Sequence, residues 1–81
     1  MLQSDVLERL QGVFESTFMD DVKVTPELTA ADVPEWDSLL HVSLVLAIER
    51  EFGLRFRIGE VEATHNVGEL ANLILKRSSG K

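Results

Sequence analysis

The 81-residue sequence contains no cysteine. A disulfide framework and a thiolate metal site are therefore both excluded. The sequence has no apolar run near the roughly 18 residues that cross a bilayer, and no charged-then-apolar leader opens it. Because these membrane and export signals are missing, we expect a protein that has no membrane span and works in the cytoplasm.

Basic residues are scarce as well, with eight Lys and Arg against 14 Asp and Glu, a net charge of −6 and a pI of about 4.7. Nucleic acid is therefore not an expected partner, because phosphate binding needs the opposite sign of charge. Acidity instead favours solubility and steering toward basic proteins.

The size of the chain limits its architecture. A 9.1 kDa chain buries roughly 60–65% of its unfolded surface on folding, which suffices for one core and leaves no room for a deep enzyme cleft. Apolar residues make up 44% of the sequence, an ordinary share for a globular domain. We expect one domain over residues 1–81, with an ordered core at about 4–77 and a frayed polar tail at 78–81.

Two long helices are predicted by apolar residues at three- and four-residue spacing. The first covers residues 4–18 with Ser4 as its N-cap, and the second covers residues 38–52 with Asp37 as its N-cap. Gly53 follows the second helix and suits the left-handed residue that ends many helices. The second helix is apolar around most of its circumference, so part of that surface either meets partners or lines a cavity.

The stretch between these helices has no sustained periodicity. Residues 19–36 contain both prolines of the chain, Pro26 and Pro34, together with several Asp and Thr residues. This composition predicts a long loop. A loop of that length often contains a short helical turn, which Thr25-Pro26-Glu27 could begin.

The C-terminal third is predicted to hold the remaining helices. Residues 54–58 alternate like a strand, but no second alternating run exists to pair with them, so we predict an extended connector. Residues 60–63 are predicted to form one short helical turn. Asn66 and Glu69 have the spacing of a capping box, which predicts a third helix to about Arg77. We therefore expect an all-α fold, a small four-helix bundle of three principal helices and one short helix, with a long loop between the first and second helices.

The Ser38 hydroxyl is placed at the first turn of the second helix. The first N–H groups of a helix have no intrahelical acceptor and lie at the positive end of the macrodipole. An anionic group esterified to Ser38 would be stabilised there by roughly 0.3–1 kcal/mol. The position therefore suits the attachment of a phosphate-linked prosthetic group, although serine beside a helix cap is also common without any modification.

Catalysis and metal binding are not expected. His41 lies one turn after Ser38, but no orienting acid or oxyanion hole accompanies the pair, so we predict a surface role for His41. His41 and His65 lie far apart in sequence, and nothing else at ligand spacing joins them into a metal site. Trp36 is predicted to anchor the loop by packing. We expect a protein that is not an enzyme.

Three motifs support a family resemblance: Asp37-Ser38-Leu39, Ala47-Ile48-Glu49-Arg50-Glu51-Phe52-Gly53 and Asn66-Val67-Gly68-Glu69-Leu70. With the predicted helices, they make residues 4–77 similar to an acyl carrier protein, of a specialised, free-standing kind. The resemblance implies that a phosphopantetheinyl transferase attaches 4′-phosphopantetheine from coenzyme A to Ser38, with Asp37 aiding recognition. It further implies a monomer whose arm holds an acyl group as a thioester and delivers it to acyl-loading and acyl-transferring enzymes.

The resemblance also assigns partner docking to the second helix, where this chain departs from the pattern of fatty acid synthesis. That pattern has carboxylates two and five residues after the serine, whereas Leu40 and Ser43 stand there. We therefore expect docking by apolar contact more than by salt-sensitive pairing, in a specialised pathway. The predicted docking residues are Leu39, Leu40, Val42, Glu49 and Arg50.

A sheltered acyl chain is a further implication of the resemblance. The residues expected either to pack the core or to line an acyl pocket are Leu44, Leu46, Ile58, Val61 and Leu70. Two alternatives to an acyl carrier stay open, namely a carrier of aminoacyl or peptidyl groups and an unmodified helical interaction module. Peptidyl carriers usually have glycines just before the serine, where this chain has Glu35 and Trp36, which favours the acyl carrier.

Overall fold

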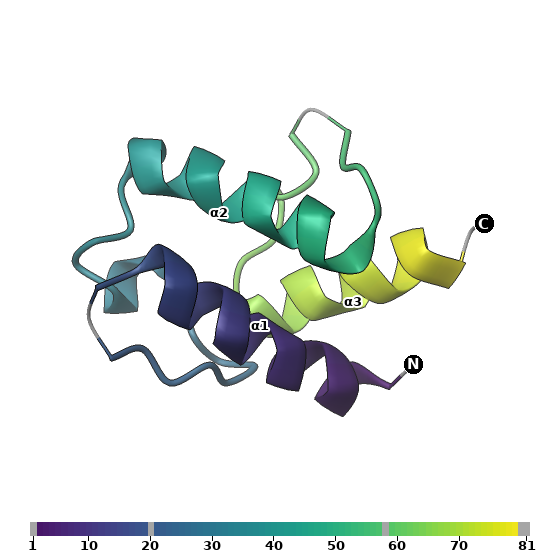
Figure 1. The fold of residues 1–81 in the computed structure, drawn as a ribbon, viewed down its shortest axis with the longest axis horizontal. Coiled ribbons are helices and arrows are strands. Elements are labelled where there is room, and N and C mark those ends of the chain that lie inside the picture. Colours follow the sequence, from purple (N-terminus) through teal and green to yellow (C-terminus); the bar gives the residue numbers. More distant parts are fainter. Residues whose placement is uncertain (1, 20, 58, 80–81) are drawn as a thin grey trace.

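The computed structural model describes residues 2–19, 21–57 and 59–79. In chain order, its elements are helix α1 (Gln3–Thr17), the 3-10 helix η1 (Ala30–Asp32), helix α2 (Ser38–Phe52) and helix α3 (Val67–Ser79). These described ranges contain no strand. The predicted all-α fold of three principal helices and one short helix is therefore confirmed (Figure 1).

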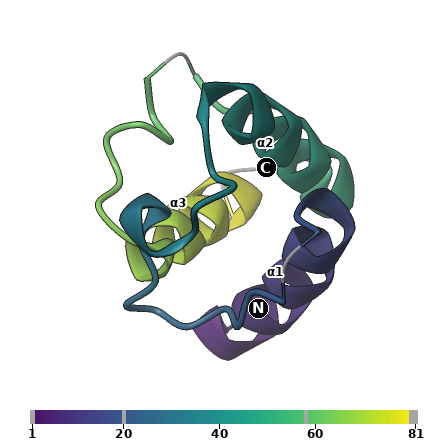
Figure 2. The same cartoon turned by 90° about the vertical axis from the view of Figure 1, so that its left-hand side faces the viewer.

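Each long helix buries one stripe of apolar side chains, and the three stripes meet in one core. In Figure 1, α1 and α2 run antiparallel, and Figure 2 shows the three helices arranged around a common interior. Burying a large apolar side chain stabilises the fold by about 1.5–3 kcal/mol relative to leaving it exposed. The largest fully buried side chains are Val6, Leu10 and Phe14 from α1, Leu44 and Ile48 from α2, and Val67, Leu70 and Ile74 from α3.

Both ends of α2 follow the sequence signals. The Asp37 carboxylate accepts a hydrogen bond from the Leu40 N–H, with 2.9 Å between the heavy atoms, as an N-cap does. Gly53 has a φ of 64°, in the left-handed region, and its N–H donates to the Glu49 carbonyl. Asp37 and Gly53 therefore set both ends of the helix that carries Ser38.

The start of α1 differs from the prediction. Ser4 is not the N-cap, because the helix already begins at Gln3. The Asp5 carboxylate instead accepts a hydrogen bond from the Leu2 N–H at 2.9 Å. Asp5 also lies near the positive end of the helix dipole, where a carboxylate is favoured.

Helix α3 begins directly after Asn66, as predicted. The Asn66 Oδ1 atom accepts a hydrogen bond from the Glu69 N–H at 2.9 Å. The Glu69 carboxylate, however, accepts from the His65 N–H at 2.9 Å, one residue before the position that a capping box uses, so this half of the prediction was wrong. The helix continues to Ser79, two residues beyond the predicted end, and residues 80–81 of the predicted tail lie outside the described ranges.

Backbone hydrogen bonds attach the first loop to α3. The Val67 N–H donates to the Leu28 carbonyl and the Gly68 N–H donates to the Pro26 carbonyl, both at 2.8 Å. These bonds satisfy two N–H groups that the start of a helix leaves without intrahelical acceptors. Gly68 also permits a close approach, since a Cβ there would lie 3.0 Å from the Pro26 carbonyl oxygen. The first loop is therefore an integral part of the fold.

The short helical segment lies elsewhere than predicted. Thr25-Pro26-Glu27 forms a turn closed by a hydrogen bond from the Leu28 N–H to the Thr25 carbonyl, and η1 follows it. Residues 59–63, which include the predicted second helical turn, form a hydrogen-bonded turn without becoming a helix. Residues 54–57 form the connector without regular structure that the sequence predicts, whereas Ile58 lies outside the described residues.

Candidate functional site

Ser38 is the first residue of α2 and is exposed. In Figure 1 this end of α2 lies on the left, away from both chain termini. No hydrogen bond joins the Ser38 hydroxyl to another residue of the described ranges. Because Asp37 caps the Leu40 N–H, the Ser38 and Leu39 N–H groups remain available to an anion at this end of the helix. The hydroxyl is therefore accessible and lies where a negative charge is favoured.

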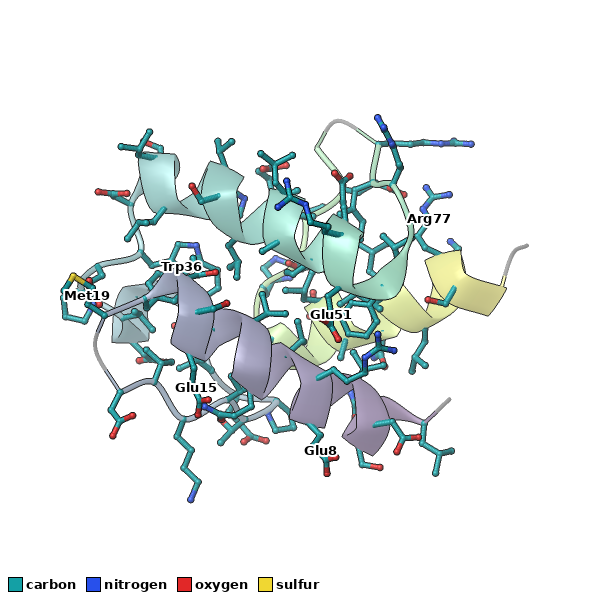
Figure 3. The ribbon with its side chains drawn as sticks, in the orientation of Figure 1. Glu8, Glu15, Met19, Trp36, Glu51 and Arg77 are labelled. Atoms are coloured by element: carbon teal, nitrogen blue, oxygen red, sulfur yellow. The ribbon has the colours of Figure 1, made fainter. Side chains whose placement is uncertain are left out.

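An aromatic cluster holds the segment that leads into Ser38. The Trp36 ring lies edge-on to Phe14, with ring centroids 5.5 Å apart, and its centroid is 5.7 Å from that of Phe18. Such pairs contribute about 0.5–1.5 kcal/mol beyond their area burial. Figure 3 shows Trp36 at the end of the bundle where α1 ends and α2 begins. Trp36 therefore anchors the loop to α1, as the sequence predicts.

His41 connects three separate segments of the chain. Its Nδ1 accepts a hydrogen bond from the Trp36 indole N–H at 3.1 Å, and its Nε2 lies 2.9 Å from the Glu62 carboxylate. The indole N–H can only donate, so Nδ1 is unprotonated and Nε2 carries the proton that Glu62 accepts. The His41 and Trp36 rings also stack, with centroids 6.2 Å apart. We call this connection the His41 bridge; it leaves no lone pair on His41 for Ser38.

The predicted surface role of His41 was therefore incomplete. The sequence shows no acid at local spacing, yet Glu62 supplies one from 21 residues further along the chain. The His41 side chain is only 22% exposed. In this geometry both ring nitrogens of His41 are hydrogen-bonded to side chains other than Ser38. Its role is to hold α2 against the segments on either side.

The pKa of Glu62 is lowered. A hydrogen bond from its own backbone N–H is the largest cause, followed by the hydrogen bond from His41, and both favour the carboxylate. The ionised Glu62 carboxylate therefore adds to the free energy of unfolding above its ordinary pKa of 4.5. This contribution is lost as the pH falls through the lowered pKa of Glu62 in the folded state.

Replacing Glu62 with glutamine should reduce the acid sensitivity of the fold. Glutamine keeps an acceptor for His41 but has no titrating group. Urea denaturation at about pH 6 and about pH 3 should show a smaller loss of unfolding free energy in Glu62→Gln than in wild type. The control Glu27→Gln removes an exposed carboxylate from the first loop. Identical pH dependence in the Glu62 and Glu27 variants would contradict this prediction.

A cavity of about 180 Å³ lies beside the His41 bridge, between the first loop, the start of α2, the segment before α3 and α3 itself. Two of the predicted pocket residues, Val61 and Leu70, line it. Two others do not: Leu44 is fully buried in the core, and Leu46 is 53% exposed on α2. Ile58, the fifth, is outside the described residues. The apolar side of the cavity is formed by Leu28, Ala30, Trp36, Val61, Val67 and Leu70.

Apolar side chains are exposed along α2. Leu39 is 77% exposed and Val42 57% exposed, and both were predicted to dock partners. Leu46 lies four residues after Val42 and joins them on one face, although it was predicted to pack the core or to line an acyl pocket. Leu40, in contrast, is half-buried and packs against the core. We call Leu39, Val42 and Leu46 the apolar face of α2.

The charged residues of α2 differ in the contacts that their side chains make within the fold. The Glu49 carboxylate accepts a hydrogen bond from the Phe56 N–H at 2.8 Å, so it stabilises the connector after the helix. Glu51 pairs with Arg9 of α1 at 3.0 Å. Arg50, the remaining predicted docking residue, is exposed.

Among the described residues, no group of three or more His, Cys, Asp or Glu side chains is placed to hold a metal ion. Over the same ranges, no helix combines the length and the apolar character needed to cross a membrane.

Comparisons with known proteins identify one family. The chain is 37% identical to an acyl carrier protein of Phenylobacterium zucineum, over 91% of its own length and 95% of that protein. It is 34% identical to one of Caulobacter vibrioides (94% and 99%) and 33% identical to one of Thermosynechococcus vestitus (91% and 93%). The chain belongs to the acyl carrier protein family, whose members carry acyl groups rather than catalyse reactions. No family model matches the chain, and no solved structure matches it significantly.

Proposed function

We propose that this protein holds an acyl group as a thioester on a 4′-phosphopantetheine arm attached to Ser38, and delivers it to partner enzymes. The observation that carries the proposal is the exposed Ser38 hydroxyl at the positive end of α2. The phosphodiester of the arm would lie where helices stabilise anions, a contribution of roughly 0.3–1 kcal/mol. The arm would also supply the only thiol of the molecule, because the chain has no cysteine.

Attachment of the arm forms one bond and breaks one. The Ser38 oxygen attacks the phosphorus that bears the pantetheine of coenzyme A, and the bond from that phosphorus to the nucleotide breaks, releasing adenosine 3′,5′-bisphosphate. We assign the base that takes the hydroxyl proton to the transferase, because both nitrogens of His41 are hydrogen-bonded within the fold. Once attached, the arm presents its thioester to successive active sites at a high effective concentration.

Intact mass tests this proposal. The apo-protein is incubated with coenzyme A, Mg²⁺ and a promiscuous phosphopantetheinyl transferase, and its mass should rise by a single prosthetic-group increment. An unchanged mass would contradict the proposal and favour an unmodified interaction module. Once the arm is attached, loading with a radiolabelled amino acid but with no fatty acid would instead favour an aminoacyl carrier.

Asp37 has one observed role and one proposed role, and two substitutions of this residue separate them. Its carboxylate caps α2 through the Leu40 N–H, and we propose that it also helps the transferase to engage. Asp37→Asn keeps a good N-cap, whereas Asp37→Ala loses it and should lower the unfolding free energy by about 1 kcal/mol. Both variants should slow arm attachment about tenfold if one charge-assisted hydrogen bond to the transferase is lost. If the arm attaches to Asp37→Asn at the wild-type rate, the proposed role of Asp37 in engaging the transferase is contradicted and only its capping role remains.

The apolar face of α2 is proposed as the docking surface for acyl-handling enzymes. Leu39, Val42 and Leu46 are all more than half exposed. The carboxylates of Glu49 and Glu51 are engaged within the fold. Docking should therefore depend on apolar contact and respond weakly to salt, since exposed ion pairs are the interactions that salt screens.

Replacing Leu39 with serine should lower kcat/KM for acyl loading about tenfold, because the most exposed apolar contact of this face would be lost. Stability should hardly change, since Leu39 is 77% exposed. Leu2→Ser is the matched control, because Leu2 is 70% exposed but lies at the start of α1. Rates of loading at low and high salt, measured on all three proteins, check the prediction. Equal acyl-loading rates for Leu39→Ser and Leu2→Ser would contradict docking through the apolar face.

A further inference from the structure

We propose that the His41 bridge is a pH-sensitive switch. When His41 takes up a proton, it releases the Trp36 indole and thereby loosens residues 33–37, the segment that leads into Ser38. The switch lies in the folded chain itself and operates with or without the arm. Two observations support it: the direction of the two hydrogen bonds of His41, and the position of Trp36 two residues before Ser38.

The bridge exists only while His41 is neutral. The Trp36 indole N–H can only donate, and it donates to the His41 Nδ1 atom at 3.1 Å. A further proton on the imidazole must bind to Nδ1, because Nε2 already carries the proton that Glu62 accepts at 2.9 Å. Two N–H groups would then face each other, and neither would have an acceptor in the other. Protonation of His41 therefore breaks the bond to Trp36.

Glu62 decides which partner the charged ring keeps. A hydrogen bond from an imidazolium to a carboxylate is roughly twice as strong as one between neutral groups. The pKa of Glu62 is lowered, chiefly by a hydrogen bond from its own backbone N–H and then by the bond from His41. Glu62 is therefore ionised throughout the range in which histidine ordinarily titrates. The charged ring stays on Glu62, and Trp36 loses its polar anchor.

Aromatic attraction does not hold the indole to the charged ring. A cation is attracted to an aromatic face within about 6 Å of the ring centroid, whereas the His41 and Trp36 centroids are 6.2 Å apart. The contacts of Trp36 with the buried Phe14 and Phe18 rings do not titrate, and they keep the indole near α1. The release is therefore a local change, and the helices stay packed.

A short piece of backbone carries the loosening to Ser38. The Trp36 N–H donates to the Val33 carbonyl at 3.0 Å, and the Asp37 N–H donates to the Glu35 carbonyl at 2.8 Å. Ser38 follows directly as the first residue of α2. Segments with few anchoring contacts open locally at a lower free energy than the core. These two backbone bonds should therefore open more often once the indole has left the bridge.

The two histidines are the side chains that change charge in the range this switch uses. Carboxyl groups ordinarily titrate below about pH 5, and lysine and arginine above about pH 10. His65 lines the same cavity, but its side chain is 84% exposed and pairs with Glu69, so it serves as an internal reference. The titratable and charged groups among the described residues of the segments around His41 are Glu35 on the first loop, Asp37 on α2, Glu62 on the turn at residues 59–63, His65 before α3 and Glu69 on α3.

Proton NMR of the Trp36 indole tests the inference. The apo-protein is used, so the outcome is separate from attachment of the arm. Trp36 is the only tryptophan, and its indole N–H therefore gives one resonance. This resonance should move upfield as the pH falls from about 8 to about 5, which we call the histidine range, because a bonded N–H lies downfield of a released one. The shift should have the same midpoint as the ring resonances of His41.

Hydrogen exchange measures the loosening before Ser38. Across the histidine range, the Trp36 and Asp37 amides should lose protection, relative to the intrinsic exchange rate at each pH, by about threefold to tenfold. That is the loss expected for one net hydrogen bond. The Val67 and Gly68 amides bond to carbonyls of the first loop and should keep their protection. Far-UV circular dichroism should stay constant, because the helices remain.

Three substitutions assign the switch to His41. His41→Gln offers an acceptor and a donor on a side chain that does not titrate, so its indole resonance should be constant across the histidine range. His65→Gln makes the same change at the other histidine and should titrate like wild type, which makes it the matched control. His41→Phe keeps a ring without nitrogens. Already at about pH 8, it should show the low amide protection that wild type reaches at about pH 5.

Several results would overturn the inference. An indole resonance that stays constant across the histidine range in wild type would show that Trp36 is not released, and this outcome needs no variant. A shift that persists in His41→Gln would assign the titration to another group. A shift without loss of amide protection would show that the release does not reach the segment before Ser38. Loss of circular dichroism over the same range would indicate unfolding of the helices in place of a local switch.

Discussion

Replacing Ser38 with alanine should abolish attachment of the arm, from complete modification to none. In the proposed reaction the hydroxyl oxygen forms the phosphoester, and alanine offers no other nucleophile at that position. The fold should survive, because Ser38 is exposed and exposed substitutions usually change the unfolding free energy by no more than about 0.5 kcal/mol. Intact mass after transferase treatment measures the first effect, and urea denaturation measures the second.

Ser43→Ala is the matched control for this substitution. Ser43 is also exposed on α2, five residues after Ser38, so the variant should be modified as fully as wild type. Modification that persists in Ser38→Ala would place the arm elsewhere and contradict the proposed attachment site. Loss of modification in both variants would indicate that the surface of α2, rather than the nucleophile, had been damaged.

Replacing Phe14 with alanine should have the largest effect on stability, a loss of about 3–5 kcal/mol. The Phe14 ring is fully buried and lies within 5.4 Å of Phe18 and 5.5 Å of Trp36, measured between ring centroids. A chain of this length has a total unfolding free energy of about 4–12 kcal/mol. The variant should therefore lie close to unfolding, and the His41 bridge should loosen because Trp36 loses its support from α1.

Urea denaturation followed by circular dichroism measures this loss, and the emission of Trp36 reports the change beside the cavity. Glu8→Ala is the control on the same helix, because Glu8 is exposed and Figure 3 shows its side chain directed away from the other helices. That variant should stay within about 0.5 kcal/mol of wild type. A loss below about 1 kcal/mol for Phe14→Ala would contradict a central role for the ring in the core.

Helix α2 and the position of Ser38 could be predicted because their signals act over short distances. Asp37 caps an N–H three residues away, and Gly53 ends the helix through its own left-handed backbone. The start of α1 was predicted less well, because Ser4 and Asp5 both suit a helix start and differ only in which N–H they can reach. Helix ends are the least well defined part of any element for this reason.

The surroundings of Ser38 were predicted only in part. Trp36 was correctly expected to anchor the loop, since a single tryptophan in a long loop has few other places to bury its ring. The exposure of Leu46 was not predicted, because the apolar surface of α2 covers most of its circumference and spacing alone does not say which side meets the core. Contact with α1 and α3 decides that orientation.

By itself the sequence determined the helical class, the limits of the helix that carries the site, and the single hydroxyl at its start, because all three depend on neighbours within one or two turns. Only the tertiary structure decided that Glu62 meets His41 and that the carbonyls of Leu28 and Pro26 satisfy the start of α3. The cavity likewise exists only where the first loop, α2 and α3 meet. Distances between residues so far apart in the chain depend on how the packed helices share one core, and residue spacing does not contain that information.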